Sequence, residues 1–201
     1  MKRVLIGLLA ACAVGTFAQG QGIRDSDSIE RPFASGGSVR LSLSSGDYTI
    51  RAGADDRVVV RWTPDQRVRG KDLRKVSIDV HTAGSAATIT TDGPTTHLRF
   101  TIEIPARSDV YLRTRAGDVT VEGIEGNKDI RMTAGDLTIG VRPSSLSRAH
   151  ASVTFGDLAA RPLGISKGGI KRSLDWAGGG TYTLDARLFA GDLKLVPAVV
   201  R

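Results

Sequence analysis

Apolar and polar residues alternate in short runs along most of the 201-residue chain. The runs are rich in β-branched residues and are separated by clusters of Gly, Asp, Pro and Ser, a pattern typical of strands joined by turns. The expected strands are Val39–Leu43, Tyr48–Ile50, Val58–Trp62, Val76–His81, Ala87–Thr91, Leu98–Ile104, Val110–Thr114, Val119–Val121, Leu137–Val141, Thr181–Ala186 and Leu193–Val196. Since no window of a dozen residues has helical periodicity, the pattern predicts one all-β domain with many short strands.

A Gly-Asp pair followed by an apolar residue occurs five times, and RAGDVTVEG and TAGDLTIG are nearly the same phrase. The pairs are Gly46-Asp47, Gly117-Asp118, Gly135-Asp136, Gly156-Asp157 and Gly191-Asp192. The second and third intervals are each about twenty residues, which matches one turn of a stacked β-structure, and the longer last interval fits two short turns or one enlarged turn. The first interval, from Gly46 to Gly117, fits this period only loosely, which predicts a different construction for the N-terminal half.

The Gly-Asp pair is expected to turn a strand corner. Leu112 and Thr114 before the pair, and Val119 and Val121 after it, are the inward candidates, so the inward set changes parity across Gly117-Asp118. A flat strand cannot change parity, whereas a corner with a glycine in a special backbone conformation can. The aspartate carboxylate can accept hydrogen bonds from backbone N–H groups freed by the bend. All ten residues of the five pairs are therefore predicted to be structural turn residues.

Residues 1–18 have the layout of a secretory signal peptide, with Lys2 and Arg3 before an apolar run that extends to Phe17. Cleavage after Ala18 would release a soluble protein, whereas Leu9-Ala10-Ala11-Cys12 resembles a lipobox and would give a lipid anchor at Cys12. Residues 19–35 have no periodicity and are expected to form a flexible leader or an irregular edge. The β domain is assigned to residues 36–201, and the mature chain is expected to be periplasmic or extracellular without a transmembrane helix.

The Gly-Asp phrases LRTRAGDVTVEGIEG and IRMTAGDLTIG, after a strand that ends in IEIP and behind an export leader, resemble a bacterial family of exported domains of unknown function labelled "putative adhesin". The resemblance covers roughly residues 36–197. It implies a stacked-sheet or β-solenoid-like domain in a role of interaction. The adhesin label is itself an analogy at the level of fold, which does not establish function.

Catalytic and metal-binding signatures are sparse in the sequence. His81, His97 and His150 have no partner at metal-ligand spacing, and no Gly-x-Ser-x-Gly nucleophile elbow is present. Stacked aspartates could bind calcium or act as a carboxylate pair, but the sequence favours structural turns, so neither a metal nor a cofactor is predicted. Cys12 is the one cysteine, so no disulfide is expected.

The densest basic segment is RVRGKDLRK, and it contributes Arg67, Arg69, Arg74 and Lys75 as candidate ligands for phosphate or uronate groups. The alternative is a solvated hairpin tip. Net charge is +7 and falls by two when the leader is removed, which favours anionic surfaces over a cognate nucleic acid that an exported chain does not meet. We therefore expect a non-catalytic envelope module that binds a polymer or protein. The alternatives are a polysaccharide-processing enzyme and an envelope-stress sensor that works with a membrane partner.

Overall fold

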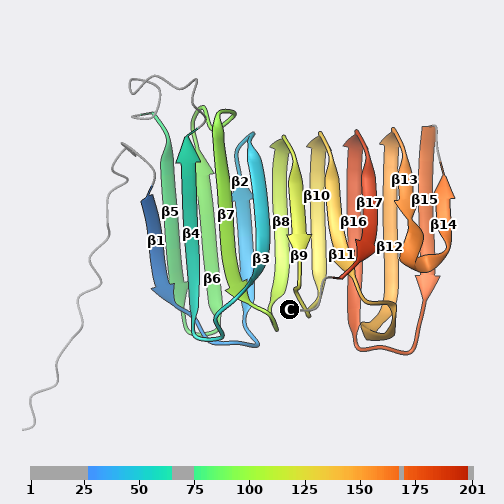
Figure 1. The fold of residues 1–201 in the computed structure, drawn as a ribbon, viewed down its shortest axis with the longest axis horizontal. Helices are drawn as coiled ribbons and strands as arrows, with labels where there is room; N and C mark the ends of the chain where they lie inside the picture. Colours follow the sequence, from blue (N-terminus) through green and yellow to red (C-terminus); the bar gives the residue numbers. More distant parts are fainter. Residues whose placement is uncertain (1–26, 65–74, 168–169, 199–201) are drawn as a thin grey trace, which may run out of the picture.

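The computed structural model describes residues 27–64, 75–167 and 170–198, and in them the chain is all-β, as the sequence predicts. Two large open sheets face each other across one hydrophobic core (Figure 1). The first sheet contains, in spatial order, β1 (Asp27–Pro32), β4 (Arg57–Pro64), β7 (Leu98–Pro105), β3 (Asp47–Gly53), β9 (Val119–Glu122), β11 (Leu137–Val141), β17 (Leu193–Pro197), β13 (Leu158–Ala160) and β14 (Ile165–Lys167).

The second sheet has eight strands in the described residues. In spatial order they are β15 (Ile170–Ala177), β12 (Leu146–Phe155), β16 (Tyr182–Ala190), β10 (Lys128–Ala134), β8 (Asp109–Ala116), β2 (Ser38–Leu43), β6 (Ala86–Asp92) and β5 (Ser77–Ala83). Two short 3₁₀ turns, η1 (Pro143–Ser145) and η2 (Arg161–Leu163), lie in the connections. No described helix has the length and hydropathy needed to cross a membrane.

The middle of both sheets is parallel, and it is built from arches, each a strand of the second sheet followed directly by a strand of the first. The arches lie in the spatial order β6–β7, β2–β3, β8–β9, β10–β11, β16–β17 and β12–β13, so both sheets carry the same order. Register is kept from arch to arch: Leu112 of β8 is level with Ile130 of β10, which is level with Ala186 of β16. Apolar side chains at alternate positions therefore meet between the sheets in continuous rows.

The arches do not follow one another in space in the order of the sequence. For that reason the intervals between Gly-Asp pairs do not indicate which pairs are neighbours. In the sequence β12–β13 follows β10–β11, but in space the two arches are not neighbours. The later arch β16–β17, which follows β15, lies between them. Gly135 and Gly156, which are successive pairs in the sequence, are consequently not neighbours. Gly46 and Gly117, which are separated by the longest interval, belong to adjacent arches.

Antiparallel strands cover both ends of the parallel stack. At one end β1 pairs with β4 and β5 with β6, and at the other β14 pairs with β13 and β15 with β12. Residues 27–32, which the sequence places in a flexible leader or irregular edge, form β1. Pairing with β4 provides hydrogen-bond partners for their backbone groups, and this does not require alternation of apolar and polar residues. Trp176 on β15 packs partly against the core, as suits an edge strand that covers an exposed end. Residues 1–26 lie outside the described residues.

The core is made by the alternation that the sequence shows. In β2 and β8, every second side chain is buried, and the parity change at the corner delivers Val119 and Val121 of β9 to the same interior as Leu112. Tyr48 and Phe100 stack at a ring-centroid distance of 4.8 Å near one end of this interior. Each such buried large side chain contributes about 2 kcal/mol. The chain therefore has an extended, regular scaffold that presents two broad outer faces and two rims.

Candidate interaction surface

The five Gly-Asp pairs gather in one row along a single rim, where the second sheet passes into the first. Gly117, Gly135, Gly156 and Gly191 have φ between +109° and +133°, whereas Gly46 adopts no positive φ. A Cβ atom on Gly135 would overlap the carbonyl oxygen of Gly117, and a Cβ atom on Gly191 would overlap that of Gly135. The glycines are thus required both by backbone conformation and by the close approach of neighbouring arches.

Backbone hydrogen bonds join each corner to the next. Gly117 N–H donates to Ala134 O at 3.2 Å, and Val119 N–H donates to Asp136 O at 2.8 Å. The N–H group of Asp136, in the neighbouring corner, donates to Asp118 Oδ1 at 3.4 Å. The same side-chain contact recurs from Asp192 N–H to Asp136 Oδ1 at 3.2 Å and from Asp157 N–H to Asp192 Oδ1 at 3.3 Å.

We call these contacts the aspartate ladder; its acceptors are Asp118, Asp136 and Asp192. Lys194 lies beside it, with Nζ 3.4 Å from Asp192 and 3.9 Å from Asp136. Among the described residues, the carboxylates of Asp47 and Asp157 accept no hydrogen bond of the ladder. Near Asp47, hydroxyl groups link the β2–β3 arch to the β6–β7 arch: Ser44 Oγ lies 2.6 Å from Thr95 Oγ1, and Tyr48 OH lies 2.8 Å from Thr91 Oγ1.

Replacing Asp136 by alanine should lower the free energy of unfolding by about 1 kcal/mol, because Asp192 N–H loses its acceptor. Asp136→Asn should cost less than about 0.5 kcal/mol, since the amide oxygen can accept the same bond and one of several adjacent like charges is removed. Urea denaturation of both variants measures the difference. An Asn variant as unstable as the Ala variant would show that carboxylate charge, rather than acceptor position, matters at this rim.

The basic loop contributes little to the described structure. Arg67, Arg69 and Arg74 lie outside the described residues. Lys75 is exposed just before β5, at the same rim as the Gly-Asp corners. The loop therefore stays a sequence-based candidate.

The structure instead shows a set of arginines that sequence reasoning missed, on the outer face of the second sheet. We call this the arginine face. Its members are Arg40 on β2, Arg113 and Arg115 on β8, Arg131 on β10 and Arg187 on β16, all of them exposed. Arg113, Arg131 and Arg187 occupy the same register on three neighbouring strands, which places them about 4.8 Å apart from strand to strand.

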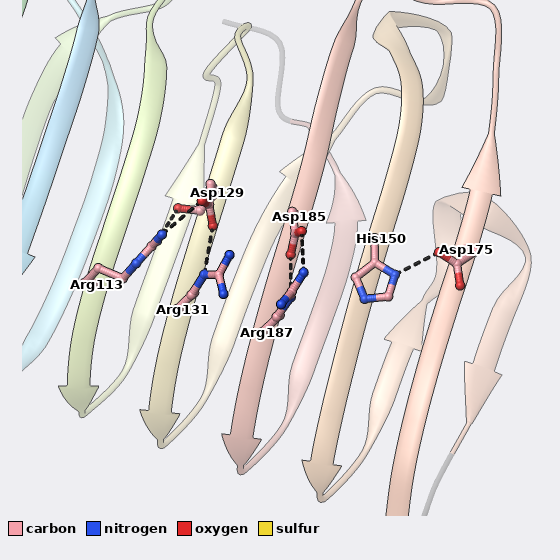
Figure 2. A network of polar contacts seen from close by, with 7 residues as sticks. All are labelled: Arg113, Asp129, Arg131, His150, Asp175, Asp185 and Arg187. Atoms are coloured by element: carbon pink, nitrogen blue, oxygen red, sulfur yellow. Dashed lines mark hydrogen bonds and ion pairs between the residues drawn. The ribbon is translucent and has the colours of Figure 1, made fainter.

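Asp129 and Asp185, which lie two residues before Arg131 and Arg187 on the same strands, form ion pairs with the arginines of this row (Figure 2). Arg113 Nη2 lies 2.9 Å from Asp129 Oδ2, and Arg131 Nε lies 3.3 Å from Asp129 Oδ1. Asp185 binds Arg187 at 2.9 Å. Partial burial acts to raise the pKa of Asp129, but the hydrogen bond from Arg113 and the charges of Arg113 and Arg131 outweigh it and lower that pKa.

Charge on this face is unbalanced. On β2, β8, β10 and β16 the five arginines share the outer face with three carboxylates, those of Asp109, Asp129 and Asp185. Asp109 accepts hydrogen bonds from the backbone and side-chain amides of Asn127 at 2.8 and 3.1 Å. The side chains of Arg113, Arg131 and Arg187 remain between 44 and 48% exposed despite their ion pairs. They are thus oriented by carboxylates and still open to solvent, as anion recognition requires.

A hollow of about 580 Å³ adjoins the arginine face at the corner rim. Arg113, Arg115 and Arg131 form one wall. The other polar lining residues are Ser42, Ser44, Ser45, Thr90, Thr91, Asp92, Thr114 and Thr133. Hydroxyls and arginines side by side suit a hydroxylated, anionic ligand.

Other polar groups are occupied by structural contacts. On the outer face of the first sheet, Glu103 accepts hydrogen bonds from Arg51 at 2.5 Å and lies 2.6 Å from Arg61. Burial acts to raise the pKa of Glu103, but the hydrogen bonds from Arg61 and Arg51 outweigh it and lower that pKa. His150 Nδ1 lies 2.8 Å from Asp175. The described residues hold no cluster of three or more His, Cys, Asp or Glu side chains that could bind a metal ion.

Comparison with known proteins finds several solved bacterial structures that are distantly similar. No family model matches the chain, and no curated protein matches it. A "putative cell adhesion protein" from Clostridium sporogenes is 10% identical, with a TM-score of 0.49, over 85% of this chain and 98% of that one.

Two further solved structures are more distant. A "putative adhesin" from Bacteroides fragilis is 11% identical with a TM-score of 0.28, over 88% of this chain and 99% of that one. A "putative lipid binding protein" from Parabacteroides distasonis is 7% identical with a TM-score of 0.27, over 87% of this chain and 98% of that one. At such identities the names describe those proteins, and the function of this chain has to be argued from its own residues.

Proposed function

We propose that this chain is a non-catalytic, exported interaction module of the cell envelope or extracellular space, and that it binds an anionic envelope polymer through the arginine face. In this proposal the stacked arches are a solenoid-like scaffold, and the Gly-Asp corners are its structural turns. The hydrogen bonds of the aspartate ladder support that role, because its carboxylates are used by backbone N–H groups.

One observation carries the binding proposal: the row formed by Arg113, Arg131 and Arg187. Three guanidinium groups in register on neighbouring parallel strands present a periodic line of positive charge on a broad sheet. A polymer with repeated uronate or phosphate groups can engage several of them together, and several weak contacts along one polymer combine into useful avidity. Asp129 and Asp185 keep the side chains extended along the sheet, which reduces the conformational entropy lost on binding.

A polysaccharide-processing enzyme would need a different arrangement. Glycoside hydrolysis uses two carboxyl groups that flank the scissile bond, one as an acid and one as a nucleophile or base. The corner aspartates lie side by side along a rim, and Asp118, Asp136 and Asp192 each accept a backbone N–H group. This geometry favours the scaffold over the enzyme.

The test is a binding assay of the mature chain with polygalacturonate and with purified envelope fractions at low and high salt. Changing Arg113, Arg131 and Arg187 together to Gln should weaken saturable binding at least tenfold, equivalent to about 1.4 kcal/mol. The matched control changes Arg31, Arg57 and Arg99 to Gln; these exposed arginines belong to the first sheet, and the variant loses the same charge.

The pattern across variants distinguishes the possible modes of binding. Equal weakening by both variants would mean that a basic protein meets an anionic surface nonspecifically, which high salt should also abolish. A third variant, with Arg67, Arg69, Arg74 and Lys75 changed to Ala, separates the basic loop from the arginine face. If only that variant loses binding, the loop and not the face is the binding element.

A further inference from the structure

A second hollow lies at the rim opposite the Gly-Asp corners. Its volume is about 380 Å³, within the range of small-molecule sites. Loops that lead from the first sheet back to the second line it, including residues 123–125 after β9 and Arg142 after β11, together with Glu122 at the end of β9. Leu146 and Leu184, near the starts of β12 and β16, contribute apolar lining from the second sheet. We call it the lysine cavity, after Lys128.

Small residues keep the lysine cavity open. Gly53, Gly123 and Gly140 line it, together with Ala52 and Ala106. None of these carries a side chain long enough to fill the space between the sheet ends. The cavity is thus a feature of the residue types at this rim rather than a packing gap among large side chains.

Lys128 is the unusual member of the lining. Lys128 is the first residue of β10 and is 5% exposed, and within the described residues its Nζ donates one hydrogen bond, to Gly126 O at 3.0 Å. An ammonium group has three donors, and a buried one with unused donors is unfavourable. Burial lowers the pKa of Lys128 to about 8, although the charges of Asp109 and Glu125 act in the opposite direction.

The neighbouring carboxylates are already engaged within the described residues. Asp109 Oδ1 accepts both amides of Asn127, and Glu125 Oε1 lies 2.7 Å from Arg142 Nη1. In the described part of the chain, neither carboxylate accepts a hydrogen bond from Lys128 Nζ. The ammonium group is therefore free to donate to a ligand in the cavity.

The charged lining consists of Arg51, Lys128 and Arg142 against Glu122 and Glu125, an excess of one positive charge. We propose that the lysine cavity binds a small apolar monocarboxylate, whose carboxylate accepts hydrogen bonds from Lys128. Its hydrocarbon part packs on the apolar lining residues Ile124, Leu146 and Leu184. A dianion such as phosphate fits less well, because Glu122 and Glu125 would repel its second charge. This site is independent of the arginine face.

The probe is sodium octanoate, titrated calorimetrically into the full chain at pH 7. We expect one saturable site, weaker binding of octanol and of inorganic phosphate, and a loss of at least tenfold in affinity for Lys128→Met. The matched control is Lys194→Met, which removes an exposed lysine from β17 and should leave octanoate affinity unchanged.

Leu184→Phe provides a test that does not depend on Lys128. It should weaken octanoate binding by reducing the space for the hydrocarbon part, while acetate binding changes little. Octanoate affinity should also fall as pH rises above about 8, where Lys128 loses its proton. The other charged groups around Lys128 are Asp109, Glu122, Glu125, Arg51 and Arg142. The proposal is wrong if octanoate does not bind, or if Lys128→Met and Leu184→Phe both bind it as the original chain does.

Discussion

Replacing Gly135 by alanine should lower the free energy of unfolding by about 3 kcal/mol or more, one of the largest single effects expected in this chain. Gly135 has φ of +109°, which costs an L-residue about 1–3 kcal/mol. The new Cβ atom would also overlap the carbonyl oxygen of Gly117, and backbone held by a hydrogen-bonded ladder on both sides cannot withdraw cheaply. Urea denaturation followed by tryptophan fluorescence measures the loss.

Gly84→Ala is the matched control for this change. Gly84 has φ of +56° in the turn between β5 and β6, and no atom lies within 4 Å of an added Cβ. The substitution should therefore cost only the backbone term, about 1–2 kcal/mol. If Gly135→Ala costs no more than Gly84→Ala, the close packing of neighbouring corners does not limit the sequence, and the repeated glycine reflects backbone conformation alone.

Much of the scaffold can be predicted from the sequence because its signals are local. Alternation marks the inward positions of β2, β8 and β9, and a parity change at Gly117-Asp118 requires a corner whatever surrounds it. The hydrogen bonds of the carboxylates differ from the local expectation: Asp118, Asp136 and Asp192 accept from the backbone N–H of the aspartate in the neighbouring corner, not from N–H groups of their own bend.

The order of the arches cannot be predicted in the same way, since it depends on which arch covers the open edge of another. Insertion of β16–β17 between β10–β11 and β12–β13 is a long-range packing choice that leaves no period in the sequence. The hydrophobic pattern does not predict β12, although it is the longest strand described, because its inward residues include Ala149 and Ala151, which carry a weak hydrophobic signal. It does not predict β1 for a similar reason: the pairing partner of this segment, not its own pattern, makes it a strand.

The candidate sites are harder to predict than the fold. Arg113, Arg131 and Arg187 are far apart in the sequence, and only the register of β8, β10 and β16 brings them into one row. A signal is present for all three, because LRTRAGD, IRMTAGD and ARLFAGD place an arginine four residues before the glycine of a Gly-Asp pair. Lys128 has no such signal, since a lysine that follows a loop is expected to be exposed.

The free energy of unfolding should change with pH because of Lys128. The change is in the direction opposite to that expected of a lysine in a salt bridge. The pKa of this side chain is about 8 in the folded chain, against an ordinary value of 10.5 for a lysine. Between these values the unfolded state binds more protons, so the free energy of unfolding rises with pH, by roughly 3 kcal/mol in total. Below pH 8 the lysine is protonated in both states, and its contribution is constant and destabilising.

Lys128→Met isolates this effect from all other titrating groups, because the variant keeps similar length and lacks the charge. At pH 7 it should be more stable than the original chain by about 2 kcal/mol, since the removed desolvation cost exceeds the hydrogen bond lost at Gly126 O. The advantage should shrink as pH rises from about 8 to 10.5 and Lys128 in the original chain becomes neutral. Urea denaturation at several pH values gives the difference directly, with Lys194→Met as the control that removes an exposed lysine. A constant difference between Lys128→Met and the original chain from pH 7 to 10 would mean that the ammonium group is well solvated, and the basis for a carboxylate partner in the lysine cavity would fall with it.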